Sequence, residues 1–167
     1  MNKQLFNYRY LINKITERLV VFLDDELVIK TIQAFYDLDS IQLMELRYLT
    51  SLINIDGVVK VFVVFSYSES LFNEIFIRYT DGLSIKDSEK EEAMMDSAGD
   101  IINIIVGNTL ADIEEPNKKI TISPPLVITA AKQVACQRGS LLYKANLDTE
   151  YGDLDIYVIS NTIGEKL

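Results

Sequence analysis

Hydrophobic residues recur at intervals of three and four in two long segments, the spacing that places side chains on one face of an α-helix. The first segment runs from Asn2 to Phe22 and predicts an amphipathic helix. The second runs from Ser88 to Asn108, where Ser88 and Glu91 have the S-x-x-E spacing of a capping box at a helix start. At about 100° per residue, one arc of this helix collects the apolar residues Met94, Ala98, Ile101, Ile102 and Ile105. Both helices are expected to bury one face against a core.

The opposite side of the second helix carries Asp96, Gly99, Asp100, Asn103 and Gly107 within about 100° of each other. An interior glycine costs a helix about 1 kcal/mol relative to alanine. Two glycines on one stripe therefore suggest that something approaches this face closely, with Asp100 and Asn103 as the projecting groups. A plain solvated face of an amphipathic helix would give a similar pattern.

Shorter apolar runs predict strands. Residues 27–36 alternate loosely and favour a strand, although a short helix has a similar pattern. The runs 44–55 and 58–67 flank Asp56-Gly57, a dipeptide preferred in type I′ turns, and predict a β-hairpin. The second of these runs is almost uniformly apolar, which predicts a central strand that is covered on both faces or lies at an interface.

The rest of the chain predicts further helix and sheet. A helix begins after Ser68 or Ser70 and ends at Tyr79 before Gly82, and a strand at 119–123 stops at Pro124-Pro125. Residues 141–147 and 154–159 form a closing hairpin. This order predicts an α+β fold in which an antiparallel-rich sheet packs against the long helix, and residues 1–167 are expected to form a single domain.

Composition narrows the function. A net charge of −9 argues against nucleic-acid binding, and the absence of histidine excludes catalysis or metal ligation by imidazole. The single Cys136 rules out an internal disulfide. No phosphate-binding glycine loop, nucleophile elbow or spaced carboxylate set occurs, so no cofactor of its own is expected. Without a long apolar span or a signal peptide at the start, we expect a cytoplasmic protein that does not insert into membranes.

Four stretches follow one another along the chain: GVVKVFVVFSYSESL, DSAGDIINIIVGN, ITISPPLVI and LLYKANLDTEYGDLDIYV. They resemble, in the same order, stretches of the CheC/CheX/FliY family of response-regulator phosphatases. The second contains the pattern of an acid, two variable residues, asparagine and a later glycine, here Asp100, Asn103 and Gly107. CheX is the most similar type because one such helix is present. Glu114 and Asn117 also have the spacing of an acid, two residues and an asparagine, but Pro116 between them argues against a shared helical face.

The resemblance implies a phosphatase that hydrolyses the aspartyl phosphate of a CheY-type response regulator. Asn103 would position the attacking water, Asp100 would pair with the regulator's active-site lysine, and Mg²⁺ would come with the regulator. Gly99 could let the partner come closer. The resemblance also implies a homodimer joined through its sheets. The family usually has glutamate where this chain has Asp100, which leaves a non-catalytic adaptor that binds a response regulator as the alternative.

Overall fold

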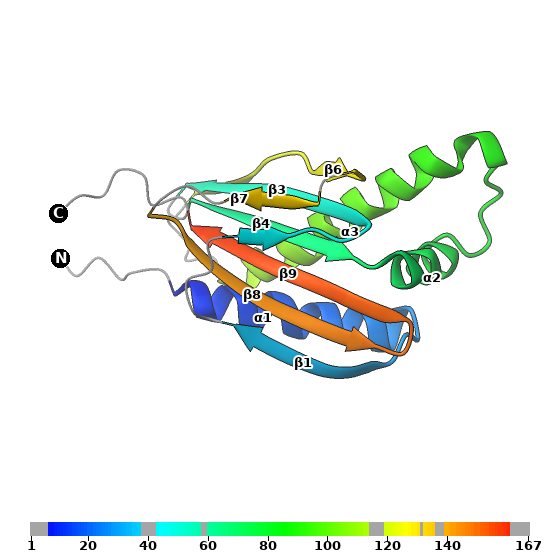
Figure 1. Ribbon diagram of the computed structural model, residues 1–167. Coiled ribbons are helices and arrows are strands. Elements are labelled where there is room, and N and C mark those ends of the chain that lie inside the picture. Colours follow the sequence, from blue (N-terminus) through cyan, green and yellow to red (C-terminus); the bar gives the residue numbers. More distant parts are fainter. Residues whose placement is uncertain are drawn as a thin grey trace.

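The computed structural model describes residues 7–37, 43–57, 60–113, 119–130, 132–135 and 139–160 (Figure 1). The helices are α1 (Tyr8–Val21), continued by the π-helical turn η1 (Phe22–Glu26), α2 (Glu69–Tyr79), and α3 (Lys90–Ile113), preceded by the 3₁₀ turn η2 (Asp87–Glu89). The strands are β1 (Thr31–Asp37), β2 (Leu43–Glu45), β3 (Leu49–Gly57), β4 (Val61–Tyr67), β5 (Ile120–Ile122), β6 (Leu126–Ile128), β7 (Gln133–Ala135), β8 (Leu141–Thr149) and β9 (Gly152–Ser160).

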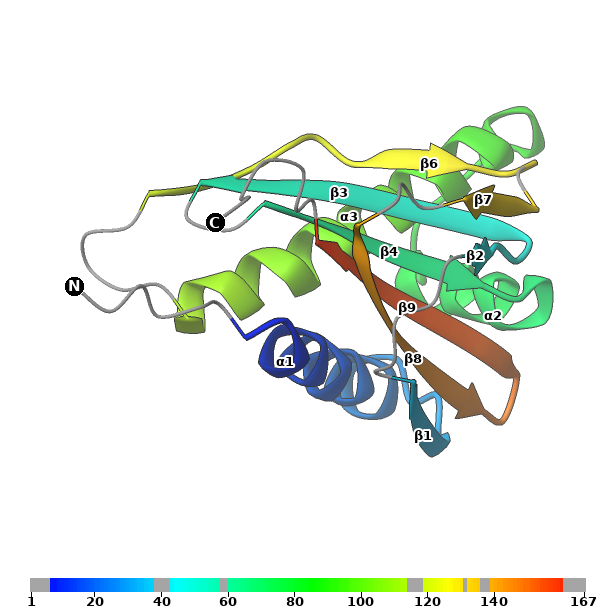
Figure 2. The ribbon, with the colours of Figure 1, turned by 60° about the vertical axis from the view of Figure 1, so that its left-hand side comes forward.

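One antiparallel sheet of seven strands organises the fold. Its order is β1-β8-β9-β4-β3-β5, and β6 also pairs with β3. In Figures 1 and 2, α1 and α3 lie against the same face of this sheet, and α2 lies near one end. The predicted α+β class with an antiparallel sheet and a long helix is therefore confirmed. The helix α2 and the closing β8-β9 hairpin also lie where the pattern predicts them.

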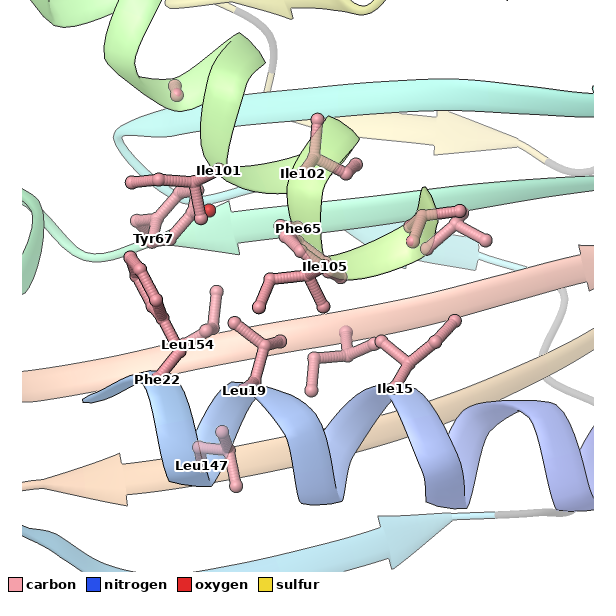
Figure 3. Close-up of a cluster of buried hydrophobic side chains, with 14 of the residues drawn as sticks. Ile15, Leu19, Phe22, Phe65, Tyr67, Ile101, Ile102, Ile105, Leu147 and Leu154 are labelled. Atoms are coloured by element: carbon pink, nitrogen blue, oxygen red, sulfur yellow. The ribbon is translucent and has the colours of Figure 1, made fainter. Parts of the chain in front are cut away.

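The main core lies between the sheet and the two helices. Alternate residues of the strands point to this face, and the apolar faces of α1 and α3 cover them. Figure 3 shows part of this contact, with Ile15, Leu19 and Phe22 from α1, Ile101, Ile102 and Ile105 from α3, and Phe65, Tyr67, Leu147 and Leu154 from the sheet. The predicted core face of the long helix is thus confirmed.

The other face of the sheet is partly covered by a small sheet of β2 and β7. Met44 of β2 packs with Val64, Leu142 and Tyr157 in a second apolar cluster. The Tyr157 hydroxyl donates to the Glu45 carbonyl oxygen at 2.8 Å, which ties β2 to β9. The strand β4 is therefore central and covered on both faces by its own chain, so its apolar sequence does not require an interface with a second subunit.

The predicted hairpin forms between β3 and β4, but its turn is not at Asp56-Gly57. Ile55 pairs with Val61, so the connection is longer than two residues, and Asp56 and Gly57 instead end β3 and pair with β5. Gly57 has φ +137°, and a Cβ at this position would collide with the Lys119 carbonyl oxygen. The close approach of β5, and not a type I′ turn, requires this glycine.

Two other boundaries differ from the sequence pattern. The predicted strand 27–36 begins only at Thr31, because the preceding residues close the end of the first helix. There the Leu27 amide donates to the Phe22 carbonyl at 3.1 Å and the Ile29 amide donates to the Leu23 carbonyl at 2.7 Å. The predicted strand 44–55 is interrupted, because β2 ends at Glu45 and β3 begins at Leu49, and the sequence pattern does not predict the short strands β6 and β7.

The capping box predicted at Ser88 and Glu91 is not formed. The helix start is a 3₁₀ turn in which the Glu89 amide donates to the Lys86 carbonyl at 2.9 Å, and Ser88 lies inside this turn, beyond the position of a capping residue. Two predictions concern residues outside those that the structure describes. They are the predictions for the pair Glu114 and Asn117 and for Cys136.

Candidate functional site

The long helix α3 carries its polar residues on one continuous surface. Between Glu92 and Ala111, every exposed side chain falls within an arc of about 160°. These side chains are Glu92, Asp96, Asp100, Asn103, Ile104, Asn108 and Ala111. We call this surface the open face of α3. Because the remaining positions are buried or half-buried, the helix can present these groups outward without losing its packing against the core.

Asp100 and Asn103 lie together near the middle of the open face. Both are exposed, and a separation of three residues places them on the same side of the helix about one turn apart. Neither side chain makes a hydrogen bond or ion pair with the described part of the chain. The structure thus leaves a carboxylate and a neutral amide free to contact a second molecule, as the sequence predicts.

Tyr79, at the end of α2, lies within electrostatic range of Asp100. Burial raises the pKa of the Tyr79 phenol, and the negative charges of Asp100 and Glu26 raise it further. The Tyr79 ring packs edge-on against Phe22 with the ring centroids 6.3 Å apart. The turn η1 and the end of α2 therefore adjoin the region of Asp100. The sequence pattern did not single out Tyr79, because this contact joins residues far apart along the chain.

Gly99 does not lie on the open face, in contrast to the prediction. It is buried, and a Cβ built on it would lie 3.2 Å from Cγ of Pro125 and 3.9 Å from Cγ2 of Val127. The close approach that this glycine allows is therefore made by the chain itself. The hypothesis that Gly99 admits a partner is wrong.

The Ser-Pro-Pro segment is held against α3 through strand β3. The Ser123 amide donates to the Asn54 carbonyl at 2.9 Å, and the Ser123 hydroxyl accepts from the Asn54 amide at 3.0 Å. This pair of bonds fixes the chain just before Pro125 reaches Gly99. The segment therefore lies against α3 at Gly99, one turn before Asn103.

Gly107 differs from Gly99. It is half-buried near the centre of the open face, and no atom of the described residues lies within 4 Å of a Cβ built on it. Ile104, one turn earlier, is 42% exposed although it is a large apolar residue. The predicted low surface on this side of the helix is thus present at Gly107 and absent at Gly99.

The described residues also form a groove away from Asp100 and Asn103. A groove of about 400 Å³ lies between α1 and the end of α3, where Arg18 and Asp112 form an ion pair across it. Neither Asp100 nor Asn103 lines this groove. Within the part of the chain that the structure describes, no three His, Cys, Asp or Glu side chains cluster as metal ligands would.

Comparison with protein families agrees with this architecture. A family model described as chemotaxis phosphatase CheX matches residues 49–143, more than half of the chain. The chain belongs to the CheX family. The match runs from the start of β3 into β8 and includes all of α3. No curated protein shows significant similarity to this CheX-family sequence.

Solved structures share the fold over nearly the whole chain. A chemotaxis protein CheX from Desulfovibrio desulfuricans has 14% identity and a TM-score of 0.71, with 89% of this chain and 97% of that chain covered. A putative chemotaxis protein from Desulfovibrio vulgaris Hildenborough has 16% identity and a TM-score of 0.73, with coverages of 89% and 95%. A chain of the CheX-CheY-BeF3-Mg complex from Borrelia burgdorferi has 17% identity and a TM-score of 0.67, with coverages of 90% and 96%.

At these identities the likeness establishes the fold of this CheX-family chain. Among its described helices, none is long and apolar enough to cross a membrane.

Proposed function

We propose that this protein hydrolyses the aspartyl phosphate of a CheY-type response regulator. The observation that carries the proposal is the pair Asp100 and Asn103, exposed side by side on α3 with no hydrogen-bond or ion-pair partner among the described residues. Membership of a family described as chemotaxis phosphatases supports it. The similar fold of a CheX that forms a complex with CheY, BeF3 and Mg supports the choice of partner.

Asn103 is the proposed catalytic residue. An aspartyl phosphate is hydrolysed when a water attacks the phosphorus in line with the bond that breaks. The amide of Asn103 stays neutral at all relevant pH values and offers both a carbonyl acceptor and an NH₂ donor, which together can fix the orientation of a water. The regulator would bring Mg²⁺, which neutralises charge on the phosphoryl group, so the phosphatase needs no cofactor of its own. Its contribution would be positioning.

Asp100 is the proposed anchor for the regulator. Its carboxylate forms no ion pair within the described chain, so it can pair with the active-site lysine of the regulator and set the register of docking. Asp100 is shorter than the glutamate usual in the family by one methylene, about 1.5 Å. We propose that the pair still forms, with the partner surface slightly closer to α3.

The shorter Asp100 favours one alternative function. If the carboxylate does not reach the lysine, Asn103 is not held near the phosphorus, and a displacement of about 1 Å can lower a rate about 100-fold. The protein would then be a non-catalytic adaptor that binds a response regulator through the same helix. This alternative predicts binding without accelerated decay of the phosphate.

The decay of phosphorylated regulator tests both functions. The substrate is a CheY-type receiver domain from the same genome, phosphorylated and mixed with wild type, Asn103→Ala or Asp100→Glu. The enzyme proposal expects faster decay with wild type and a loss of about 100-fold with Asn103→Ala. Asn73→Ala, which changes an exposed asparagine on α2, serves as the matched control and should have no effect. Wild type that binds without accelerating decay supports the adaptor, and rescue by Asp100→Glu would then assign the cause to the missing methylene.

We further propose a cytoplasmic homodimer joined through its sheets. The strand β1 forms an edge of the large sheet, and its side chains Ile32, Phe35 and Tyr36 are exposed. Long, apolar sheet edges tend to pair with another chain. Light scattering after gel filtration measures the molar mass directly, and a monomer at micromolar concentration would contradict this proposal.

A further inference from the structure

The two interior glycines of α3 have different explanations. Each costs the helix about 1 kcal/mol relative to alanine. At Gly99 the contact with Pro125 accounts for that cost, since a methyl group there would press on the proline ring. At Gly107 the described chain offers no such reason, because the space above it is open. The glycine lies on the open face one turn beyond Asn103, where an outside surface can approach it.

Ile104 gives the open face its only large apolar group between Glu92 and Ala111. It is 42% exposed, whereas the other isoleucines of this range, Ile101, Ile102 and Ile105, are almost fully buried. It lies one turn after Asp100 and one turn before Gly107, so a projecting apolar side chain stands next to a low point of the helix surface. A projecting side chain beside a gap in the helix surface favours packing against the side chains of a partner.

The charge around Ile104 restricts the partner. From Glu91 to Ile113 the helix contains no lysine or arginine, while the open face carries the carboxylates of Glu92, Asp96 and Asp100. A surface that packs on Ile104 must therefore lie within a negative field. A partner with an apolar contact bordered by basic side chains has the complementary chemistry.

We infer that Ile104 and Gly107 form the docking contact for the response regulator, which places an apolar side chain on Ile104 and brings its backbone close over Gly107. This inference rests on the proposed function and adds the determinants of partner recognition. Four residues of helix span about 6 Å, so the contact at Gly107 lies one turn away from Asn103. Ile104 and Gly107 thus contribute affinity for the regulator and take no part in the chemical step.

Ile104→Ser and Gly107→Ala test the inference in two measurements. The first is affinity for a CheY-type receiver from the same genome loaded with beryllofluoride and Mg²⁺, and the second is the steady-state dephosphorylation of the same receiver. Both variants should weaken affinity about tenfold and raise KM by a similar factor, with kcat within about twofold of wild type. Ile77→Ser, which removes a 63% exposed isoleucine from α2, is the matched control and should change neither.

The outcomes separate this inference from the proposed function. If both variants bind and turn over like wild type while Asn103→Ala loses activity, the docking contact is refuted and the phosphatase proposal stands. If the variants lose affinity but wild type does not accelerate decay, the docking contact stands for an adaptor. Wild type that neither binds the loaded receiver nor accelerates its decay refutes both. A thermal unfolding midpoint for Gly107→Ala no lower than that of wild type excludes misfolding as the cause of lost affinity.

Discussion

The contact between Gly99 and Pro125 makes a quantitative prediction about stability. Alanine at a helix-interior glycine gains about 1 kcal/mol of helix propensity. At position 99 the new Cβ would lie 3.2 Å from Cγ of Pro125, closer than the roughly 3.5–4.0 Å at which carbon atoms pack well. The ring must retreat by a few tenths of an ångström, and overpacking of this kind costs about 1–3 kcal/mol. Gly99→Ala is therefore expected to leave stability unchanged or to lower it by up to about 2 kcal/mol.

Gly107→Ala is the internal standard for this experiment, because it has the same helix, the same substitution and no opposing atom. It should raise the free energy of unfolding by about 1 kcal/mol, which corresponds to a rise in the thermal midpoint of about 2–4 °C for a chain of this size. The difference between the two variants should therefore be about 1–3 kcal/mol. Urea unfolding at neutral pH, followed by circular dichroism, measures it.

Pro125→Ala identifies the source of the difference. If the proline ring opposes the new methyl group, Gly99→Ala should stabilise the protein in the Pro125→Ala background, and the double-mutant cycle should give a coupling of at least about 1 kcal/mol. Equal stabilisation by Gly99→Ala and Gly107→Ala in the wild-type background, with no coupling to Pro125, would refute the structural explanation for Gly99.

Three further predictions concern the sheet. Asp155→Asn should destabilise the protein by about 3 kcal/mol in urea unfolding, because the Asp155 side chain is 3% exposed and accepts a hydrogen bond from Arg47 at 2.6 Å. The control Asp153→Asn, at a side chain that is 39% exposed, should cost less than about 1 kcal/mol, and equal costs for the two variants would contradict the prediction. Tyr67→Phe should keep or raise stability by up to about 1 kcal/mol, since the buried Tyr67 hydroxyl has no hydrogen-bond partner of good geometry among the described residues; a loss above about 1 kcal/mol would reveal one. Burial raises the pKa of both Tyr67 and Tyr157 above the usual value near 10, so the contribution of these phenols to stability should be constant below about pH 10. Above that pH it should fall by about 1.4 kcal/mol per pH unit for each phenol, as the urea midpoint would report; Tyr67→Phe should reduce that slope.

Sequence periodicity predicts the elements that bury a continuous apolar face. The core residues of α3, such as Ala98 and Ile102, follow the helical repeat, and β4 is long enough for its apolar run to identify a central strand. Asp100 and Asn103 are exposed on one side of α3 as the pattern predicts, because their relation depends only on the geometry of one helix. Their proposed roles come from the family resemblance, which periodicity does not supply.

Contacts between distant parts of the chain are not encoded in a local pattern. The role of Gly57 depends on the approach of β5, and that of Gly99 depends on Pro125. The local pattern suggests a tight turn for Gly57 and an open stripe for Gly99. In both cases a segment beside a strand, distant in the sequence, determines the actual role. The start of α3 differs for another reason, since a 3₁₀ turn at Asp87 takes the place of the capping arrangement at Ser88.

The placement of all the proposed site residues on one unbroken helix has an evolutionary consequence. From Asp100 to Gly107, the helical repeat alone sets their relative positions, so substitutions in the sheet can accumulate without moving one residue relative to another. A single inserted or deleted residue within 100–107 would rotate part of the face by about 100° and separate the amide from the carboxylate or from the glycine. Changes in length are instead expected in the connection between α2 and α3, residues 80–86, where an added residue leaves the spacing within the helix untouched.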